Sequence, residues 1–344
     1  HVFRYATNTR RGKMVDGEHT DTVRAIAHSN RGLWSTAGDD KQVILWDEGF
    51  EHVLARYTHR KKITTAVFDP DGRLIIGDKY GEVWRLTPVE TTSQIGDPRH
   101  IEFAQAPPNS MEPEAQGCAE LLFGHLAVVT AMECIQTHGY LFTADRDEKI
   151  RMSLYPSYQV IHAFMLGHTE YVSALHYSPQ YEQVISTSAD GTIRRWSLST
   201  GQQVGAAFHV DPTSKRAVIA CSAYDYTCDK IYYVCENSPT VVVTLGLPGA
   251  PETGAEITVC PLDTGRPIQS LCLVGSLLLC VDRSTGCLFQ ATSGRILFQP
   301  DATLLVGDTS TESMVSYYKH TSVEVMDKAA AAAAGEQQNI LSQV

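Results

Sequence analysis

Three histidines stand at matching distances from hydroxyl and carboxylate side chains, a pattern that could perform proton transfer or build hydrogen-bond chains. Each histidine is followed 21 or 22 residues later by an aspartate, with a hydroxyl four residues before that aspartate. A tryptophan stands six residues after the first and third aspartates. The residues are His19, Thr36, Asp40 and Trp46, then His125, Thr143 and Asp147, then His168, Ser186, Asp190 and Trp196. Such a chain satisfies buried polar groups and fixes a turn, so we interpret the three sets as structural networks rather than catalytic ones.

The clearest copy of the pattern lies between Leu166 and Leu198. It contains three short alternating apolar runs and a tight turn at Asp190-Gly191, where glycine permits a positive φ. A single small antiparallel sheet cannot bury both of its faces, so neighbours of the same kind are required. The offsets place each histidine before the first strand and each aspartate in the turn between the second and third strands, on one rim. Repetition at this spacing predicts an all-β fold, a seven-bladed β-propeller of WD repeats.

The blades are expected to form a single domain over residues 1–327. Blades one to six begin near residues 22, 63, 128, 172, 217 and 268, and a three-stranded blade seven covers 303–326. We expect Val2–Thr7 to supply the missing fourth strand and close the ring, because closure removes exposed strand edges. Residues 88–116 are rich in Pro, Thr, Gln and Glu and are interpreted as a mobile insertion before the last strand of blade two. The tail, 328–344, is assigned no function.

Composition and motifs argue against several kinds of chemistry. The chain carries a net charge of −11, which disfavours extensive nucleic-acid wrapping by the chain alone. None of the nine cysteines has the CxxC spacing of a zinc site, so no metal is predicted. The sequence contains no GxSxG, P-loop, HExxH or strand-linked GxGxxG motif. We therefore predict no catalytic residue and no cofactor. The odd number of cysteines and the absence of a signal-type or membrane-spanning apolar run favour an intracellular protein.

The segment Ala144–Pro156 departs from the repeat because Ser153 stands where tryptophan would be, and it is unusually charged. Alternation places Lys149 and Arg151 on one face of its strand. Arg194 holds the position in blade four that matches Arg151. The two arginines are either a pair of adjacent cations that bind a partner or ordinary solvated strand residues. A second cluster, Arg60, Lys61 and Lys62, connects blades one and two. It is either a functional cluster or an ordinary basic loop.

The segment ADRDEKIRMSLYP, followed by FMLGHTEYVSALHYSP and preceded by LLFGHLAVVTAMEC and GDKYGEVWRL, resembles the WD-repeat non-catalytic subunit of the tRNA (guanine-7-)methyltransferase. The likeness is close from about Gly77 to Trp196 and only topological in blades five to seven. It implies that the protein is not itself an enzyme. It implies a heterodimer with a Rossmann-type, S-adenosylmethionine-dependent catalytic subunit that forms 7-methylguanosine in the tRNA variable loop, with tRNA reached only through the complex.

In that family the basic position of the DRDEKIR motif lies at the subunit contact. Carried over, this is Arg151, with Lys149 beside it, and we expect both to pair with carboxylates of the catalytic subunit. The candidate partner-binding residues are Lys149, Arg151, Arg146, Arg194 and Tyr171. The candidates for contact with tRNA phosphates in the assembled complex are Arg60, Lys61 and Lys62. The resemblance gives the nucleus as the expected location, with the cytoplasm left open. The alternatives are a generic WD-repeat scaffold, such as a ubiquitin-ligase substrate adaptor, and a self-sufficient enzyme in a propeller frame.

Overall fold

The computed structural model describes fifteen segments of the chain: residues 2–6, 11–15, 18–50, 52–90, 101–102, 119–135, 137–210, 217–236, 240–245, 258–265, 267–274, 277–284, 288–291, 296–298 and 340–341. All regular secondary structure in these segments is β-strand. Six of the sheets are four-stranded and antiparallel. No helix among the described residues is long and apolar enough to cross a membrane.

Each four-stranded sheet corresponds to one predicted blade. Blade one contains β3 (Val23–His28), β4 (Trp34–Gly38), β5 (Gln42–Trp46) and β6 (Val53–Thr58), and blade two contains β7 (Ile63–Phe68), β8 (Leu74–Asp78), β9 (Glu82–Leu86) and β12 (Ala119–Gly124). Blade three contains β13 (Val129–Ile135), β14 (Tyr140–Asp145), β15 (Ile150–Leu154) and β16 (Ile161–Met165), and blade four contains β17 (Val172–Ser178), β18 (Gln183–Ser188), β19 (Thr192–Ser197) and β20 (Phe208–His209). Blade five contains β21 (Ile219–Asp225), β22 (Lys230–Cys235), β23 (Thr240–Leu245) and β24 (Thr258–Asp263), and blade six contains β25 (Ile268–Val274), β26 (Leu277–Asp282), β27 (Leu288–Gln290) and β28 (Ile296–Phe298).

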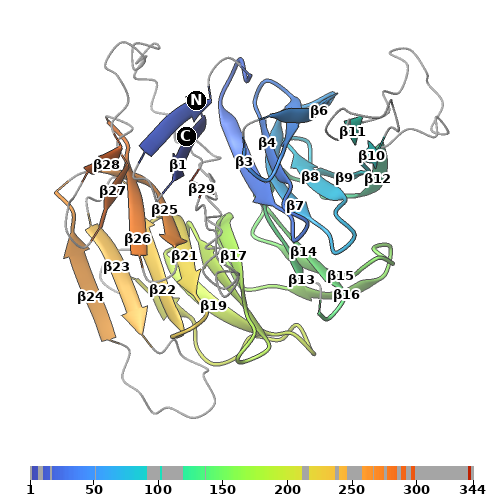
Figure 1. The fold of residues 1–344 in the computed structure, drawn as a ribbon. Helices are drawn as coiled ribbons and strands as arrows, with labels where there is room; N and C mark the ends of the chain where they lie inside the picture. The colour runs from blue at the N-terminus through green and yellow to red at the C-terminus, as the bar shows by residue number, and fades with distance from the viewer. Residues whose placement is uncertain are drawn as a thin grey trace.

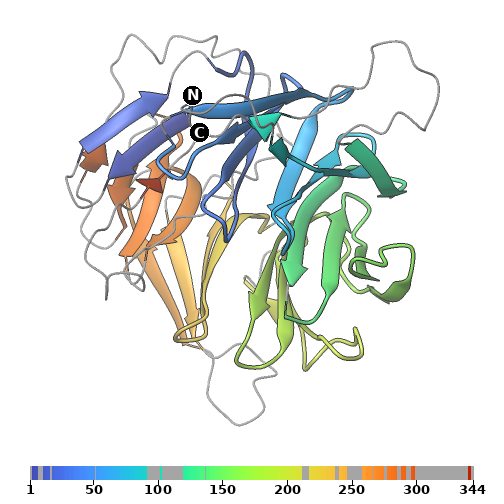
Figure 2. The same ribbon diagram turned by 45° about the vertical axis from the view of Figure 1, so that its right-hand side comes forward.

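The blades succeed one another around a common centre in chain order (Figures 1 and 2). Their first strands line that centre, because β3 contacts β7, β7 contacts β13, and the series continues through β17 and β21 to β25. This arrangement confirms the predicted WD-type β-propeller. The turns between second and third strands, and the connections between blades, share one rim, which we call the turn rim. The other turns lie on the opposite rim.

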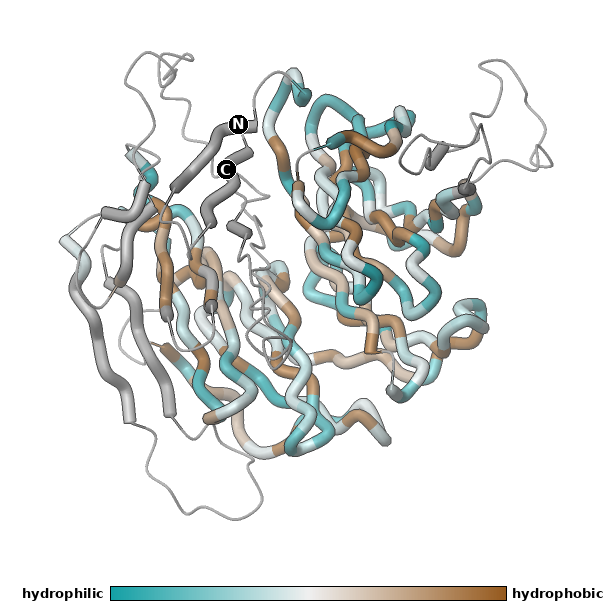
Figure 3. The backbone as a smooth tube through the Cα atoms, viewed as in Figure 1, coloured by the Kyte–Doolittle hydropathy of each residue, from teal (hydrophilic) through white to brown (hydrophobic). Residues whose placement is uncertain are grey.

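The hydrophobic core lies between neighbouring sheets. Val43 and Leu45 of blade one form one cluster with Ile63 and Leu74 of blade two, and comparable clusters join each later pair of blades up to blade six. Figure 3 shows hydrophobic segments along the strands and hydrophilic ones at many of the turns. Because both faces of an inner sheet are covered, β4, β8 and β18 are buried at every position. Period-two alternation of polar and apolar residues is accordingly weak in these strands.

The inserted segment of blade two leaves the sheet intact. β12 pairs with β9 from Ala119↔Leu86 to Gly124↔Glu82, as expected for a last strand that resumes after a long insertion. Within the insertion, β10 (Val89–Glu90) pairs with β11 (Ile101–Glu102), and β11 contacts β6 of blade one. The rest of the predicted insertion lies outside the described residues.

The N-terminal strand was predicted at Val2–Thr7, and the structure has β1 at Val2–Ala6. β1 lies between blade six and blade one (Figures 1 and 2). Its described partners are β2 (Arg11–Val15) and β29 (Ile340–Leu341), neither of which the sequence predicted as a strand. The strands predicted between residues 303 and 326 lie outside the described residues, so the number of blades and the closure stay predictions.

Polar side chains also tie blade four to blade five. His176 of β17 lies 2.8 Å from the Ser222 hydroxyl through Nε2, and Ser222 lies 3.1 Å from Thr187 of β18. Burial lowers the pKa of His176 from its ordinary value of about 6.5 to about 4. The histidine is therefore neutral in the folded protein at neutral pH.

The lowered pKa of the partly buried His176 predicts that the protein loses stability on acidification. The unfolded chain takes up a proton below pH 6.5, whereas the folded protein takes it up only near pH 4, so the stabilisation is present above pH 6.5 and is lost toward pH 4. Between pH 7 and pH 5 we expect a loss of about 2 kcal/mol in the free energy of unfolding, measured by urea denaturation. His176→Asn, which can still bond Ser222, should remove most of this dependence. Equal stability of the wild type at the two pH values would contradict the role of His176.

A candidate partner-binding surface on blade three

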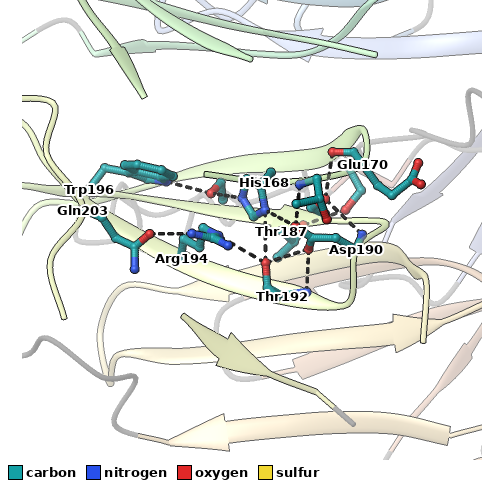
Figure 4. A network of polar contacts seen from close by, with 12 residues as sticks. His168, Glu170, Thr187, Asp190, Thr192, Arg194, Trp196 and Gln203 are labelled. Carbon is teal, nitrogen blue, oxygen red and sulfur yellow. Dashed lines mark hydrogen bonds and ion pairs between the residues drawn. The ribbon is translucent and has the colours of Figure 1, made fainter. Parts of the chain in front are cut away.

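The predicted turn networks form in blades one and four. In blade one, His19 Nδ1 lies 2.7 Å from Asp40 and its Nε2 lies 2.7 Å from the Thr36 hydroxyl, which also accepts a hydrogen bond of 2.9 Å from Trp46 Nε1. Blade four repeats this arrangement (Figure 4). His168 lies 3.0 Å from Asp190 and 2.7 Å from Ser186, and Trp196 donates to Ser186 over 2.8 Å.

These networks fix turns and have no exposed reactive group. Burial alone would raise the pKa of Asp190, but its bond to His168 and the bonds it accepts from Thr192 and Thr169 hold that pKa below its ordinary value. Burial lowers the pKa of His168. Asp190 therefore stays ionised, and its second oxygen accepts the backbone N–H of Thr192, the first residue of β19, over 2.8 Å. Holding the turn against the strand is the role that the geometry supports.

In blade three the prediction of Asp147 as the network carboxylate is wrong. His125 bonds Asp145 over 3.0 Å and the Thr143 hydroxyl over 2.7 Å, whereas Asp147 is exposed. Asp145 is the last residue of β14 and caps the N–H of Lys149, four residues on, over 3.0 Å. In blade three the carboxylate that bonds the histidine thus stands two residues after the hydroxyl of Thr143. In blades one and four the corresponding carboxylate stands four residues after the hydroxyl.

Blade two contains a related pair that the sequence reasoning missed. His59 Nε2 lies 3.2 Å from Asp78, the last residue of β8, and Asp78 caps the N–H groups of Tyr80 and Glu82. The signal was present, since Asp78 and Asp145 both stand four residues before the capped N–H at the start of the third strand. A search for His, hydroxyl and Asp at fixed spacing misses this pair, because Ile76 stands where blade three has the hydroxyl residue Thr143.

Ser153, which replaces tryptophan, changes the packing of blade three. The Arg151 guanidinium donates to Ser153 Oγ over 2.8 Å and to the Tyr158 carbonyl over 3.0 Å, and it lies 3.8 Å above the Phe123 ring of β12. Arg151 is 8% exposed, and burial lowers its pKa. It therefore joins blade three to blade two, and the expectation that it pairs directly with a partner's carboxylate does not fit this geometry.

The loop after β15 is held by a second group of polar contacts on the opposite rim. The Tyr158 hydroxyl donates to Glu120, which also pairs with Arg85, and the Tyr155 hydroxyl donates to Asp69 of blade two. Burial would raise the pKa of Glu120, but the bonds from Tyr158 and Arg85 outweigh it and hold that pKa below its ordinary value. The loop carrying the Tyr158 carbonyl is thereby fixed, and Arg151 is fixed with it.

Side chains that could reach a partner lie on the turn rim of blade three and along its edge strand. Arg146 is exposed at the tip of the blade-three turn, and Lys149 is half-buried with its Nζ 3.0 Å from the Asp147 carbonyl. Leu126 is 99% exposed in the preceding connection. Leu166 and Phe164, on or next to the edge strand β16, are 63% and 48% exposed. We call Leu126, Arg146, Lys149, Phe164 and Leu166 the blade-three surface.

Backbone contacts hold the blade-three surface together. Ile150 pairs with Met165, which brings the neighbouring Lys149 and Leu166 to adjacent strands at the same level. The Arg146 N–H donates to the Val128 carbonyl over 2.9 Å, which holds the turn beside the connection that carries Leu126. Exposed leucines next to cations form a surface suited to an apolar segment flanked by carboxylates.

The two blade-four candidates are half-buried and lie in other contacts. Arg194 donates to Gln203 over 2.6 Å and to Thr192 over 3.3 Å (Figure 4). Tyr171 precedes β17 and accepts the Ala189 N–H through its carbonyl. Arg194 occupies the register position of Arg151, opposite Ser186 as Arg151 is opposite Thr143. Both arginines are thus engaged in contacts within the propeller, Arg194 inside blade four and Arg151 also across to blade two, so the predicted pair of adjacent exposed cations does not form.

The three basic residues that connect blades one and two differ in their surroundings. Lys62 Nζ lies 3.4 Å from Asp39 and 3.6 Å from Asp21, so its charge is balanced locally. Arg60 is exposed, and Lys61 lies 3.8 Å above the Tyr80 ring. Across the described residues, no group of three or more His, Cys, Asp or Glu side chains could hold a metal ion.

The fold and the recurring His–Asp turns define a WD-type β-propeller protein. A family model described as the tRNA methyltransferase TRM82 WD40 domain matches residues 99–251, and a model of the WD domain, G-beta repeat, matches residues 13–47. A computationally designed protein, Ika8, shares the overall fold with a TM-score of 0.54 and 17% identity, over 82% of this chain and 75% of that one.

Comparison with curated relatives gives a finer resemblance. The chain is 28% identical to the tRNA (guanine-N(7)-)-methyltransferase non-catalytic subunit wdr4 of Dictyostelium discoideum, over 75% of this chain and 56% of that protein. The mouse subunit WDR4 is 29% identical over 59% of this chain and 46% of its own length, and the Xenopus laevis subunit is 32% identical over 55% and 43%. The predicted resemblance to WD-repeat non-catalytic subunits of tRNA (guanine-7-)methyltransferase is confirmed. The chain spans about half the length of these relatives.

Proposed function

We propose that this protein is the non-catalytic subunit of a tRNA (guanine-7-)methyltransferase. It binds, stabilises and orients a separate Rossmann-type subunit that holds S-adenosylmethionine and forms 7-methylguanosine in the tRNA variable loop. The names of the relatives support the subunit role. Modification of nuclear tRNA by this complex would place the protein in the nucleus, which is part of the proposal.

The blade-three surface is the observation that carries the docking proposal. A tryptophan in the place of Ser153 would anchor an ordinary repeat, but here the serine accepts a hydrogen bond from Arg151, and the turn presents Arg146 and Lys149 beside two exposed leucines. Cations at the edge of an apolar contact set the register and the association rate, while the apolar side chains supply most of the affinity. We therefore expect a partner segment with apolar residues flanked by Asp or Glu.

Reversing the two exposed charges tests the proposal. Arg146→Glu with Lys149→Glu should weaken co-purification of the methyltransferase subunit and raise the dissociation constant at least about tenfold, because charges that attract the partner would repel it. Binding is measured by titrating the purified catalytic subunit against the immobilised full chain. The unfolding midpoint should stay nearly unchanged, because Arg146 is exposed and the half-buried Lys149 side chain bonds only a carbonyl of its own turn.

A charge-matched control distinguishes local contact from net charge. Arg31→Glu with Lys41→Glu makes the same change at exposed positions of blade one and should leave the affinity near that of the wild type. If both double variants weaken binding equally, the effect is one of overall charge. If neither does, or if the wild-type chain fails to bind the methyltransferase, the proposed docking site is wrong.

A further inference from the structure

An exposed tyrosine lies among cations on the turn rim of blade two, where the next residue, Gly81, accepts the His125 N–H over 2.8 Å beside the connection that carries Leu126. Tyr80 is 63% exposed, and Lys61 Nζ lies 3.8 Å from the centre of its ring. Arg60 and Lys79 are exposed beside them in the chain. We call Arg60, Lys61, Lys79 and Tyr80 the Tyr80 platform.

The backbone that carries the Tyr80 platform is rigidly held. Asp78, itself bonded to His59, accepts the Tyr80 N–H over 2.8 Å. The Lys79 N–H donates to the Lys62 carbonyl over 2.9 Å, which fastens the turn to the basic connection. Gly81 has a φ of +92°, and a Cβ there would come within 2.5 Å of two carbonyl oxygens of residues 125 and 127. The platform thus needs little ordering on binding, which favours affinity.

The charges of the Tyr80 platform are available to an anion. Arg60, Lys61 and Lys79 form no ion pair with any carboxylate in the described segments, whereas Lys62 is balanced by Asp21 and Asp39. The acidic side chains of the turn are engaged elsewhere, since Asp78 bonds His59 and Glu82 accepts a hydrogen bond from Trp84 Nε1. A group of unbalanced cations is unusual in a chain of net charge −11.

We propose that the Tyr80 platform binds an unpaired segment of RNA. A nucleobase stacks on the exposed part of the Tyr80 ring, and Arg60, Lys61 and Lys79 contact the adjoining phosphates. Exposed aromatic rings flanked by Lys and Arg are how proteins hold unpaired nucleotides without reading a particular sequence. An acidic peptide would use the cations alone and would gain little from the ring, so the aromatic side chain favours RNA.

This contact goes beyond the proposed subunit role, because it requires no methyltransferase subunit. The residues belong to blade two and its connection from blade one, whereas the docking residues belong to blade three and its connections. The two proposals are tested with different substitutions and different ligands, so they can fail separately.

The test measures binding of a fluorescein-labelled single-stranded RNA of about 12 nucleotides to the full chain by anisotropy, at about 50 mM salt. Tyr80→Ala should weaken binding about tenfold, and Tyr80→Phe should bind like the wild type because the ring is kept. Arg60→Gln with Lys79→Gln should reduce the slope of log affinity against log salt by about 1.4, since each phosphate contact on a single strand contributes about 0.7.

Tyr226→Ala is the matched control. Tyr226 is also 63% exposed, but it follows Asp225 in blade five, and its described neighbours in the chain, residues 223–229, include no Lys or Arg. It should leave RNA affinity unchanged, and both tyrosine variants should bind the methyltransferase subunit normally.

Three results would overturn the RNA contact. The first is no measurable RNA binding by the wild type, and the second is equal RNA affinity of the Tyr80→Ala and Tyr226→Ala variants. The third is that polyglutamate displaces the RNA and binds the wild type and the Tyr80→Ala variant with the same affinity. The last result would assign the surface to an acidic polypeptide.

Discussion

Replacing Asp229 with alanine should lower the free energy of unfolding by about 3–5 kcal/mol, because it leaves a buried guanidinium without its counter-ion. Arg195 of β19 is 2% exposed and pairs with Asp229 of blade five over 2.5 Å. The same carboxylate accepts the Tyr224 hydroxyl over 2.7 Å, and Arg195 has one other described bond, 3.2 Å to Gln183. Removing the carboxylate therefore disrupts the contact between blades four and five.

Urea denaturation checks this result, with Asp71→Ala as the control. Asp71 pairs with Arg73 at an exposed site, where an ion pair contributes at most about 1 kcal/mol. Replacing Arg195 and Asp229 together with leucine should cost less than the single change, because no buried charge is then left unpaired. A loss for Asp229→Ala no greater than that for Asp71→Ala would show that the buried pair does not hold the two blades together.

Arg151→Leu should lower the free energy of unfolding by about 3 kcal/mol, the expected size of a charge-assisted hydrogen bond together with a desolvated cation–π contact. The substitution leaves the Tyr158 carbonyl without the donor that Arg151 provides and uncovers the Phe123 ring. Any loss of methyltransferase binding should then follow from loosening of blade three. Amide hydrogen exchange in β15 and β16 measures that loosening directly.

Arg146→Leu provides the matched comparison. It removes the same kind of side chain five residues away, at an exposed position. We expect unchanged exchange in β15 and β16 together with weaker partner binding. If Arg151→Leu leaves both unfolding and exchange as in the wild type while partner binding fails, Arg151 contacts the partner directly, as the sequence first suggested.

Local patterns were sufficient to predict most of the sheet architecture. The strands Val23–His28, Ile63–Phe68 and Ile268–Val274 have the bounds expected from apolar runs set between turn residues. The networks of His19 and His168 followed from spacing alone, because the connection before a blade and the turn within it meet on one rim. Repetition made these predictions possible, since each copy checks the others.

Blade three shows where the sequence reasoning failed. Offsets counted from the hydroxyl selected Asp147, although Asp145 has the better geometry because it ends β14 and reaches both His125 and the Lys149 N–H. The burial of Arg151 depends on Phe123, a residue of another blade, and on a carbonyl seven residues on. Contacts of this kind arise only once the sheets are packed, and no spacing rule encodes them.

The four tryptophans of the chain stand in β4, β5, β9 and β19, which belong to blades one, two and four. Blade three has none, since Ser153 occupies that place. Intrinsic tryptophan fluorescence will consequently report on blades one, two and four but not on blade three, where the methyltransferase subunit is proposed to bind. A fluorescent amino acid introduced in blade three would report separately on the unfolding of that blade and on the binding of a partner to it.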